Sequence, residues 1–570
     1  MRATRAVCVM AGAWLGFAAS PVPAPELSYA LEPVVAKNGT VDALAVTLTF
    51  RGPASGTLTL DLPNESEGEK ARWRFLTDFN VTGARLAAAD PATRTLTFVP
   101  GAPVTVRYRV HSAYDGDPPG ADGNPYRGAV VRPSWFATLG EFVFAVPQGS
   151  DAWPANFHWG ALPRGWTAAS DLEHGTMGRA MTGSDILEST LIGGVDVKVL
   201  SRPISGGTLR LAVRGTWRFS TDNLADVLAR TLSAQRDFWG NDVKGPFLVT
   251  LLPLTGSGST GGTGRSDGFA LYGTADITQS SFQRTIAHEH SHTWIPGRIG
   301  TLRDLAQEPL DYWFSEGFTD FYASRTLLKS GVWSLEDFTG DLNDRLLAYD
   351  VSPSRNASNS EIAAKFWTDD DIAQLPYRRG MLLAFVWDKR LRDAGKANLD
   401  AVMFAARDRF TAAAAKPNAA ENFLAAYRSV SGDDLGTEIA RFVTAGETVS
   451  LPHDLFGACA RVDTIQIASF DRGFDGETSA KSGVITGVAH GGPAYAAGLR
   501  DGMKRIKREG GKEGDSRVPI GYRVADGQGR ERLITYLPTG KGQVTIQQVV
   551  LTPGRSDAAR RDCVRSMAGG

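Results

Sequence analysis

Residues 284–294, RTIAHEHSHTW, place three histidines and one glutamate within five positions of a chain that has only eight histidines in 570 residues. The segment has the length and composition of a helix closed by a Pro-Gly pair, and helical residues four apart differ by only ~40° around the axis. His288 and His292 are therefore predicted to share a face. His290 lies about 200° from His288, so we expect a core or supporting residue there and not a ligand of the same metal.

His288, Glu289 and His292 form the pattern H-E-x-x-H. Two neutral imidazoles on one helix face suit a zinc ion, and the glutamate between them lies where it can take a proton from a metal-bound water. The pattern also occurs by chance in long proteins. A catalytic zinc site therefore requires a third ligand elsewhere in the chain.

The candidate third ligand is Glu316, in the helix-like stretch LDYWFSEGFTDFYASRTLL (310–328). A His-His-Glu set leaves the fourth position of a tetrahedral zinc open for water, as in catalytic sites. Asp320, one turn further on, is predicted to accept the outer N–H of a ligating imidazole. The alternative is that both carboxylates form a solvated acidic face. Aromatic neighbours argue against exposure: Trp313, Phe314, Phe318 and Phe321.

The segments HEHSHTWIPGRI, WFSEGFTDFYA and LPYRRGMLLAFVWDKRLR resemble the glycyl aminopeptidase family of zinc metallopeptidases, whose catalytic domain is thermolysin-like. The resemblance implies one zinc ion bound by His288, His292 and Glu316, with Glu289 as general base and proton shuttle. It also implies that Tyr377 stabilises the tetrahedral intermediate, although Tyr312 and Tyr322 stay open as alternatives for this hydroxyl.

One departure from the family concerns substrate binding. Family members carry a Gly-Gly-Leu-Glu-His segment whose glutamate holds the amino terminus of the substrate. The corresponding segment here is interpreted as GRSDG (264–268), which would place Asp267 where that glutamate stands. Asp267 is therefore the candidate amine-binding residue, and the alternative is an ordinary aspartate in a turn before glycine.

Hydropathy patterns predict a multidomain α+β chain. Residues 1–20 have the basic start and apolar centre of a signal peptide, and no other stretch is apolar enough to span a membrane. Residues 25–215 alternate apolar and polar positions, as in a β-sandwich-like domain, whereas 216–455 are mainly helical and form the predicted thermolysin-like catalytic domain. Residues 460–555 follow as a further module, and 556–570 as a C-terminal tail.

The C-terminal module is similar to bacterial protease PDZ domains through SGVITGVAHGGPAYAAGLRDGM (482–503). Such domains bind extended peptides by adding a strand to a sheet edge, so a peptide ligand is a possible partner. The alternative is a module that only packs on the catalytic domain.

Charge and cysteine content narrow the partners and the location. Sixty-one basic and 62 acidic residues nearly cancel, which gives no reason to expect a nucleic-acid partner. Export, to the periplasm or the medium, follows from the signal peptide. After its removal Cys459 and Cys563 remain, and they could pair or stay as separate thiols.

Three functions fit these observations. The first is an exported zinc aminopeptidase for short peptides with small N-terminal residues. The second is a zinc endopeptidase whose PDZ domain selects protein substrates. The third is a catalytically idle peptide-binding scaffold. Cleavage of acetylated peptides would separate the first two, and the complete set of predicted catalytic residues disfavours the third.

Overall fold

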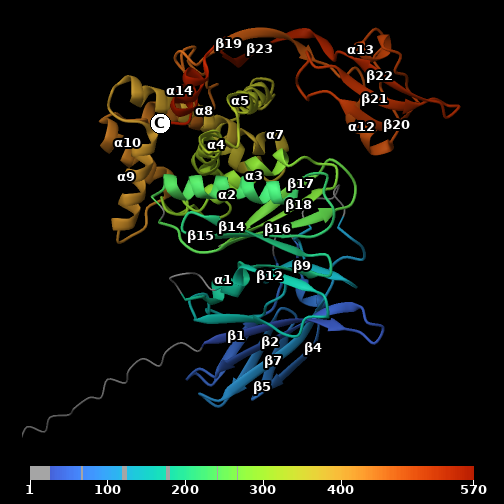
Figure 1. Cartoon of the computed structure of the whole chain (residues 1–570), viewed down its shortest axis with the longest axis vertical. Helices are drawn as coiled ribbons and strands as arrows, with labels where there is room; N and C mark the ends of the chain where they lie inside the picture. Colours follow the sequence, from blue (N-terminus) through green and yellow to red (C-terminus); the bar gives the residue numbers. More distant parts are fainter. Residues whose placement is uncertain are drawn as a thin grey trace, which may run out of the picture.

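The structure, a computed structural model, describes residues 26–65, 69–118, 125–174, 180–240, 242–265 and 267–569. The predicted signal peptide lies outside the described residues. The multidomain combination of sheets and helices expected from the sequence is present: N-terminal sheets, a central sheet, a helical region and a C-terminal module follow one another in space (Figure 1). Within the described ranges, no helix is long and apolar enough to cross a membrane.

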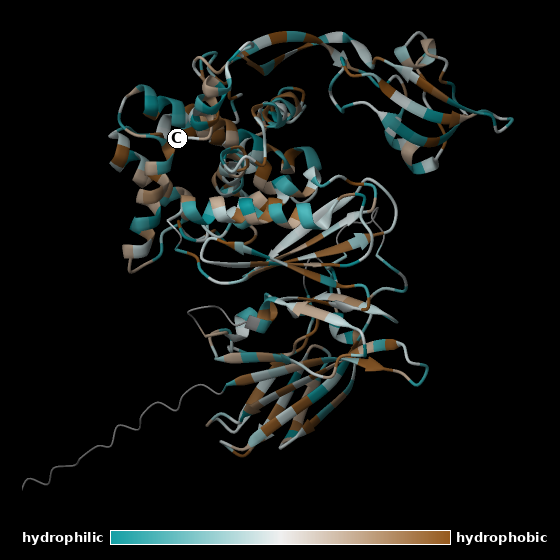
Figure 2. Ribbon diagram, in the orientation of Figure 1, coloured by the Kyte–Doolittle hydropathy of each residue, from teal (hydrophilic) through white to brown (hydrophobic). Residues whose placement is uncertain are grey.

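Two N-terminal sheets share one apolar core. The first has the order β11 (Ala155–Trp159), β1 (Leu27–Val35), β2 (Val41–Arg51), β7 (Pro103–His111), β4 (Leu76–Thr82), and the second the order β10 (Val146–Pro147), β3 (Thr57–Asp61), β6 (Thr93–Phe98), β5 (Ala84–Asp90). Buried residues alternate with more exposed ones along β1 and β2, so hydrophobic and hydrophilic residues alternate on these strands in Figure 2. The short η1 (Arg72–Phe75) precedes β4.

A third small sheet connects this region to the rest of the chain. Its order is β12 (Thr167–Ser170), β13 (Thr190–Gly194), β9 (Trp135–Leu139), β8 (Val130–Arg132). Apolar side chains of these strands share a core with one face of the central sheet. The short elements beside them are η2 (Gly140–Phe142), η3 (Asp171–His174) and α1 (Gly183–Leu187).

The central sheet positions the candidate site. Its order is β14 (Lys198–Ile204), β15 (Gly207–Val213), β16 (Phe247–Leu254), β18 (Gly268–Thr274), β17 (Thr260–Arg265). Strands β14 and β15 fall within the range 25–215 but pair into this sheet. Helices α2 (Thr221–Phe238) and α3 (Ser280–Ser291) cover the face opposite the small sheet through a common apolar core.

The glycine-rich stretch 255–268, interpreted from sequence as a flexible loop, contains β17. Strand β17 is antiparallel to β18, from Thr260 opposite Gly273 to Arg265 opposite Gly268, and it forms the edge of the sheet. The ladder bonds to β18 hold this strand although its sequence, TGGTGR, has a low intrinsic preference for strands.

The helical region is built around α4 (Tyr312–Lys329) and α8 (Leu375–Asp393), which lie in one large core with their neighbours. The other elements of this region are η4 (Glu308–Leu310), α5 (Leu335–Asp350), α6 (Asn359–Lys365), α7 (Asp370–Ala373), α9 (Leu399–Ala412), α10 (Ala419–Ser431), α11 (Gly436–Glu438) and the π-helical η5 (Ile439–Thr444).

A long antiparallel ribbon, β19 (Ala460–Phe470) with β23 (Thr539–Leu551), leads from the helices to the C-terminal module (Figure 1). The module has a three-stranded sheet in the order β20 (Lys504–Gly510), β21 (Ile520–Ala525), β22 (Glu531–Tyr536), with α12 (Gly476–Ser482) and α13 (Pro493–Ala496). Its buried residues form a core of their own.

The chain returns to the helical region after β23. Residues 556–570, predicted as a tail, contain α14 (Asp557–Met567), whose Cys563 and Met567 are buried in the helical core. Cys459 and Cys563 form a disulfide with Cα atoms 5.5 Å apart, so the pairing left open by the sequence is present. The bridge joins the start of the ribbon to the last helix.

Candidate metal centre

Three side chains converge between α3 and α4. Nε2 of His288 lies 3.1 Å from Nε2 of His292 and 3.1 Å from Oε2 of Glu316, and His292 Nε2 lies 3.5 Å from that oxygen. One ligand atom from each residue lies within 4.8 Å of the other two, as a bound metal ion requires. His292 follows the last residue of α3 but keeps helical backbone angles, so the one-turn spacing expected from the sequence holds.

The outer nitrogens of both rings are engaged elsewhere. His288 Nδ1 lies 2.8 Å from Oδ1 of Asp320, and His292 Nδ1 lies 2.8 Å from the carbonyl oxygen of Ile295. In the neutral form of both rings, the proton that each Nδ1 donates to its acceptor leaves a lone pair on each Nε2, directed toward the other ring and toward Glu316. A cation between these atoms relieves their repulsion, and two imidazole nitrogens with one carboxylate oxygen suit zinc.

The electrostatics of the cluster also favour a cation. Burial lowers the pKa of His288, but hydrogen bonds and charge from Asp320 and Glu316 raise it overall to about 10. Burial opposes ionisation of Glu316, yet the two imidazoles hold the pKa of its carboxyl well below the usual range. The negative potential that draws a proton to His288 also attracts a divalent ion.

His290 lies on the other side of α3, away from the cluster. Its ring is 2 % exposed, its Nδ1 lies 2.7 Å from Oε1 of Gln235, and it packs edge-on against Phe247 and Trp294. Burial and, to a smaller extent, the positive charge of Arg236 together lower the pKa of His290 to about 3. This neutral core histidine is consistent with the role expected from its helical angle.

Asp320 lies behind the imidazole of His288, on the side away from Glu316 and His292. Its Oδ1 forms an ion pair with Arg284 at 2.8 Å in addition to its contact with His288, and its Oδ2 accepts a hydrogen bond from Arg345 at 2.6 Å. Although burial opposes ionisation, the two guanidinium groups keep the pKa of this carboxyl far below its ordinary value. Asp320 is thus an ionised acceptor that fixes the His288 ring.

Glu289 lies beside the cluster and beneath the edge strand. A Cβ built on Gly264 of β17 would lie 3.3 Å from Oε2 of Glu289, so the strand passes directly over this carboxylate. The negative charge of Glu289 contributes to the raised pKa values of both His292 and Tyr377. A general base at this position is therefore close to the metal ligands and to the phenol.

Gly264 lies against Glu289, and Asp267 follows it by three residues. Asp267 lies in the turn between β17 and β18, where its carbonyl oxygen accepts from the backbone N–H of Leu248 and its charge interacts with Asp171 and Arg236. The strand register places Gly264, three positions before Asp267, over Glu289.

Tyr377 reaches the cluster from α8. Its ring stacks on that of His288 with centroids 5.8 Å apart and an interplanar angle of 28°. Burial raises the pKa of Tyr377, and the charges of Glu316, Asp320 and Glu289 raise it further. The hydroxyl therefore stays protonated at neutral pH and can donate a hydrogen bond.

Two facing glycines allow α8 to approach so closely. A Cβ on Gly380 would lie 1.8 Å from the carbonyl oxygen of Trp313, and one on Gly317 would lie 2.4 Å from Cα of Gly380. Backbone therefore packs on backbone where α4 and α8 meet. Gly317 follows the metal-ligand candidate Glu316, and Gly380 follows Tyr377 by three residues, so this contact sets the distance between the two side chains.

The alternative hydroxyls differ in position. Tyr322 is buried and its hydroxyl lies 3.1 Å from Oδ1 of Asp400, which directs it into the helical core. Tyr312 forms a side-chain hydrogen bond with Glu308, and burial and the charge of Glu308 raise its pKa well above the usual value, with a smaller effect of Glu316. Tyr312 therefore remains close enough to the cluster to be tested beside Tyr377.

The sequence analysis did not single out four residues that the structure places near the candidate metal centre: Gly264, Arg284, Glu308 and Arg345. Arg284 lies one turn before His288, so its place on the same helix face could have been read from the spacing. The others depend on tertiary structure: a strand within a glycine-rich stretch, a short helical turn before α4, and a helix that packs from the side.

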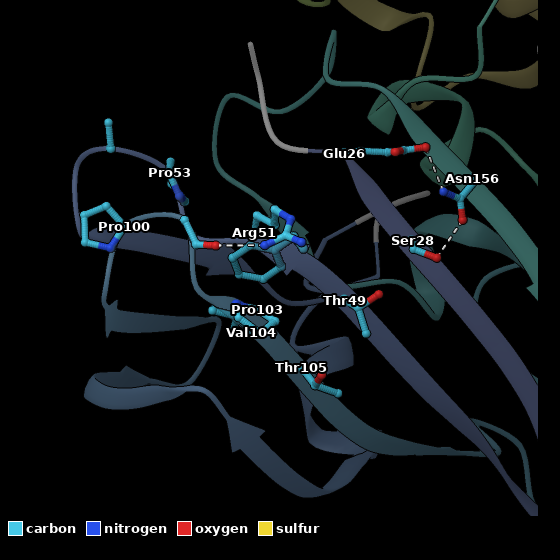
Figure 3. Close-up of a pocket in the computed structure, with 14 residues that line it drawn as sticks. Glu26, Ser28, Thr49, Arg51, Pro53, Pro100, Pro103, Val104, Thr105 and Asn156 are labelled. Atoms are coloured by element: carbon cyan, nitrogen blue, oxygen red, sulfur yellow. Dashed lines mark hydrogen bonds between the residues drawn. The ribbon is translucent and has the colours of Figure 1, made fainter. Parts of the chain in front are cut away.

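A separate hollow of about 670 Å³ lies in the N-terminal sheets (Figure 3). Asn156 donates to Glu26 at 3.0 Å and accepts from Ser28 at 2.6 Å, and Arg51 donates to the carbonyl oxygen of Gly101 at 3.1 Å. These polar groups are thus bonded to other groups of the same wall. They do not converge on one point, as the side chains of the candidate metal centre do.

Residues 281–374, which contain all three converging side chains and Glu289, match the M61 glycyl aminopeptidase family. This catalytic segment belongs to that family. The glycyl aminopeptidase segment makes the chain a zinc metallopeptidase, a hydrolase of peptide bonds. No curated protein matches the chain.

Solved structures of peptidases resemble this chain over most of its length. An aminopeptidase N family protein from Idiomarina loihiensis is 17% identical over 95% of this chain and 100% of its own, with a TM-score of 0.64. An M1 zinc metallopeptidase from Deinococcus radiodurans is 19% identical over 76% of this chain and 95% of its own, with a TM-score of 0.46. At these identities, the first likeness establishes the overall fold alone.

Proposed function

We propose that this chain is an exported aminopeptidase that hydrolyses short peptides with small N-terminal residues, using one zinc ion bound by His288, His292 and Glu316. The observation that supports the proposal is the convergence of one ligand atom from each of these residues within 4.8 Å, on neighbouring helices of a peptidase segment. Glu289 is the proposed general base, and Tyr377 the proposed hydrogen-bond donor to the oxyanion.

Zinc bound at this site supplies a Lewis acid that polarises the scissile carbonyl and lowers the pKa of a water molecule in the site. Glu289, adjacent to His288 in the chain, takes a proton from that water and passes it to the leaving amine. Tyr377 is kept protonated by its surroundings and donates to the developing oxyanion. Asp320 holds the His288 ring in the orientation that this geometry requires.

The preference for a free amino terminus requires a group that holds an ammonium ion. Asp267 is the residue proposed from the sequence, and its position two residues beyond β17 keeps it in the same segment as the edge strand. An endopeptidase is the second candidate, and one observation favours it: Gly264, which faces Glu289 from β17, provides no carboxylate for an ammonium group.

A matched pair of peptides tests the proposal. Gly-Ala-Phe with a free and with an acetylated amino terminus is incubated with the full chain, with Glu289→Gln as the blank, before and after zinc is removed by a chelator. Cleavage of the free peptide alone, lost with zinc and restored by its return, is expected. Cleavage of both peptides would make the chain an endopeptidase, and zinc-independent cleavage would refute the metal mechanism.

Variants on the edge strand identify the amine anchor. If Asp267 holds the ammonium group, Asp267→Asn raises KM for the free peptide and leaves zinc content unchanged. Gly264→Glu places a carboxylate beside Glu289 and is expected to hinder cleavage of the acetylated peptide. A parental KM in Asp267→Asn would exclude Asp267 from substrate binding.

Export and a peptide ligand complete the proposal. The N-terminal pattern of residues 1–20 supports cleavage of a signal peptide, and the bridge between Cys459 and Cys563 is compatible with an oxidising compartment, either the periplasm or the medium. Mass spectrometry of the mature protein would locate the cleavage site. For residues 460–555, proposed as a PDZ domain, β22 at the sheet edge is the strand to which an extended peptide could add.

A further inference from the structure

A network of four charged residues lies behind the metal centre and joins three helices. Asp320 of α4 forms an ion pair with Arg284 of α3 at 2.8 Å and accepts a hydrogen bond from Arg345 of α5 at 2.6 Å. Asp341 of α5 accepts from the same two arginines, at 2.7 Å from Arg284 and 3.3 Å from Arg345. Charges of both signs therefore alternate from the helix of His288 to a helix that contributes no predicted ligand.

Each member of the network holds another in place. Asp320 is 3 % exposed, and its two oxygens have different partners. Oδ1 is hydrogen-bonded to His288 and forms an ion pair with Arg284, whereas Oδ2 accepts a hydrogen bond from Arg345. Among the residues that the structure describes, only Arg345 is found bonded to Oδ2, so its removal would leave that oxygen without this charge-assisted partner and free the carboxylate to rotate. Rotation of the carboxylate would move the acceptor that fixes His288.

Helix α5 is itself held from its other side by the ribbon. The Asn343 side chain donates to the carbonyl oxygen of Val549 at 3.0 Å and accepts from its N–H at 2.6 Å. Oδ2 of Asp350 accepts from the backbone N–H of Gln547 at 2.7 Å. These contacts fix the position of the helix from which Arg345 extends.

We propose that Arg345, supported by Asp341, is a positioning residue of the metal centre: from α5 it fixes the Asp320 carboxylate and, through it, the His288 imidazole. The inference rests on the proposed zinc site. The proposal adds that the zinc affinity of the ligands on α3 and α4 depends on the guanidinium group of Arg345 on a third helix, α5. Arg345 acts through Asp320 and touches neither substrate nor metal.

The test compares zinc affinity in Arg345→Met, Arg345→Lys and the parent by competition with a fluorescent chelator. Loss of an outer partner of a ligating histidine typically weakens metal binding 10–100-fold, so we expect Arg345→Met to raise the zinc Kd by about that factor. Arg345→Lys keeps one charge but not the planar fork, and is expected to recover part of the affinity.

Arg325→Met is the matched control for general loss of stability. Arg325 lies on α4, its side chain is 4% exposed, and it forms an ion pair with Asp400 at 3.1 Å. It is not among the described partners of the Asp320 carboxylate, which are His288, Arg284 and Arg345. Its replacement is expected to lower the melting temperature of the zinc-free protein without changing the zinc Kd. A zinc Kd in Arg345→Met equal to that of the parent, or matched by Arg325→Met, would overturn the proposal.

Two further measurements separate the possible failures. If the parent binds no zinc, the proposed metal site fails, and with it the inference; if the parent binds zinc and Arg345→Met binds it equally well, only the inference fails. Should Arg345→Met not fold, Asp341→Asn replaces it, because it removes the carboxylate that braces both arginines. If Asp341→Asn and Arg345→Lys both fold and both bind zinc with the affinity of the parent, the positioning role of Arg345 is refuted.

Discussion

Gly380→Ala tests the close contact of α4 and α8. The added Cβ would lie 1.8 Å from the carbonyl oxygen of Trp313, so a helix backbone must shift by about 1 Å or more to reach ordinary contact. Overpacking of this kind costs about 3 kcal/mol at the upper end of its usual range, offset by about 1 kcal/mol of better helix propensity. We expect a net loss of about 2 kcal/mol, which corresponds to a melting temperature about 4–8 °C lower for a domain of this size.

The same shift should impair catalysis. Tyr377 lies three residues before Gly380 and stacks on His288, so separation of the helices moves the hydroxyl relative to the site. A displacement of about 1 Å can reduce turnover up to about 100-fold. The assays are thermal unfolding followed by circular dichroism, kcat and KM on the free peptide, and zinc content, which should stay at the parental value.

Gly340→Ala is the control, because Gly340 lies within α5 and a Cβ there meets nothing within 4 Å. It should gain roughly 0.5–1 kcal/mol of stability from helix propensity alone. If Gly380→Ala were stabilised to the same extent, or kept the parental kcat, the packing of α4 against α8 would not control the position of Tyr377.

Four further predictions follow from the site and its surroundings. Glu289→Gln should lower kcat by about 10²–10⁴-fold while the zinc content measured by atomic emission stays unchanged, as expected for the loss of a general base. Tyr377→Phe should lower kcat by about 10²–10³-fold at constant KM; a parental kcat would transfer the oxyanion role to another donor. His292→Ala should lose zinc and His290→Ala should keep it, so equal loss in both would refute the ligand assignment. Burial raises the pKa of Asp350 from 3.8 to about 6, which makes ionisation unfavourable in the folded state. The parent should therefore lose stability relative to Asp350→Asn as the pH rises from about 4 to 6, by about 3 kcal/mol in total, and a constant difference in melting temperature from pH 4 to 8 would contradict this.

The common face of the two candidate histidine ligands could be predicted from the sequence because it depends on local helix geometry. The four-residue spacing of His288 and His292 fixes their common face, and the aromatic residues around Glu316 indicate a buried helix. The same geometry separates His290 from the other two histidines. The alternating pattern of the N-terminal strands likewise depends on the period of a single strand.

The edge strand and the charged network could not be predicted in this way. Nothing in TGGTGR favours a strand, and β17 forms because β18 offers it a partner. Asp267 is proposed as the amine anchor from the resemblance to the family's glutamate-containing segment, and it lies three residues beyond Gly264, which faces Glu289. Arg345 is 57 residues from His288 in the sequence, and only the packing of α5 brings it behind the metal centre.

The disulfide and the ribbon make the C-terminal module an insertion. Cys459 precedes β19, Cys563 follows β23, and the two strands pair from Ala460–Leu551 to Phe470–Thr539. The module thus enters and leaves the catalytic body at one place, and a tight turn joining the far ends of the ribbon would remove it without opening the helical core. Trimming from the C-terminus would instead strip α14 from that core. The module could therefore be exchanged for another by recombination, in evolution or in the laboratory, while the helical core and the disulfide stay intact.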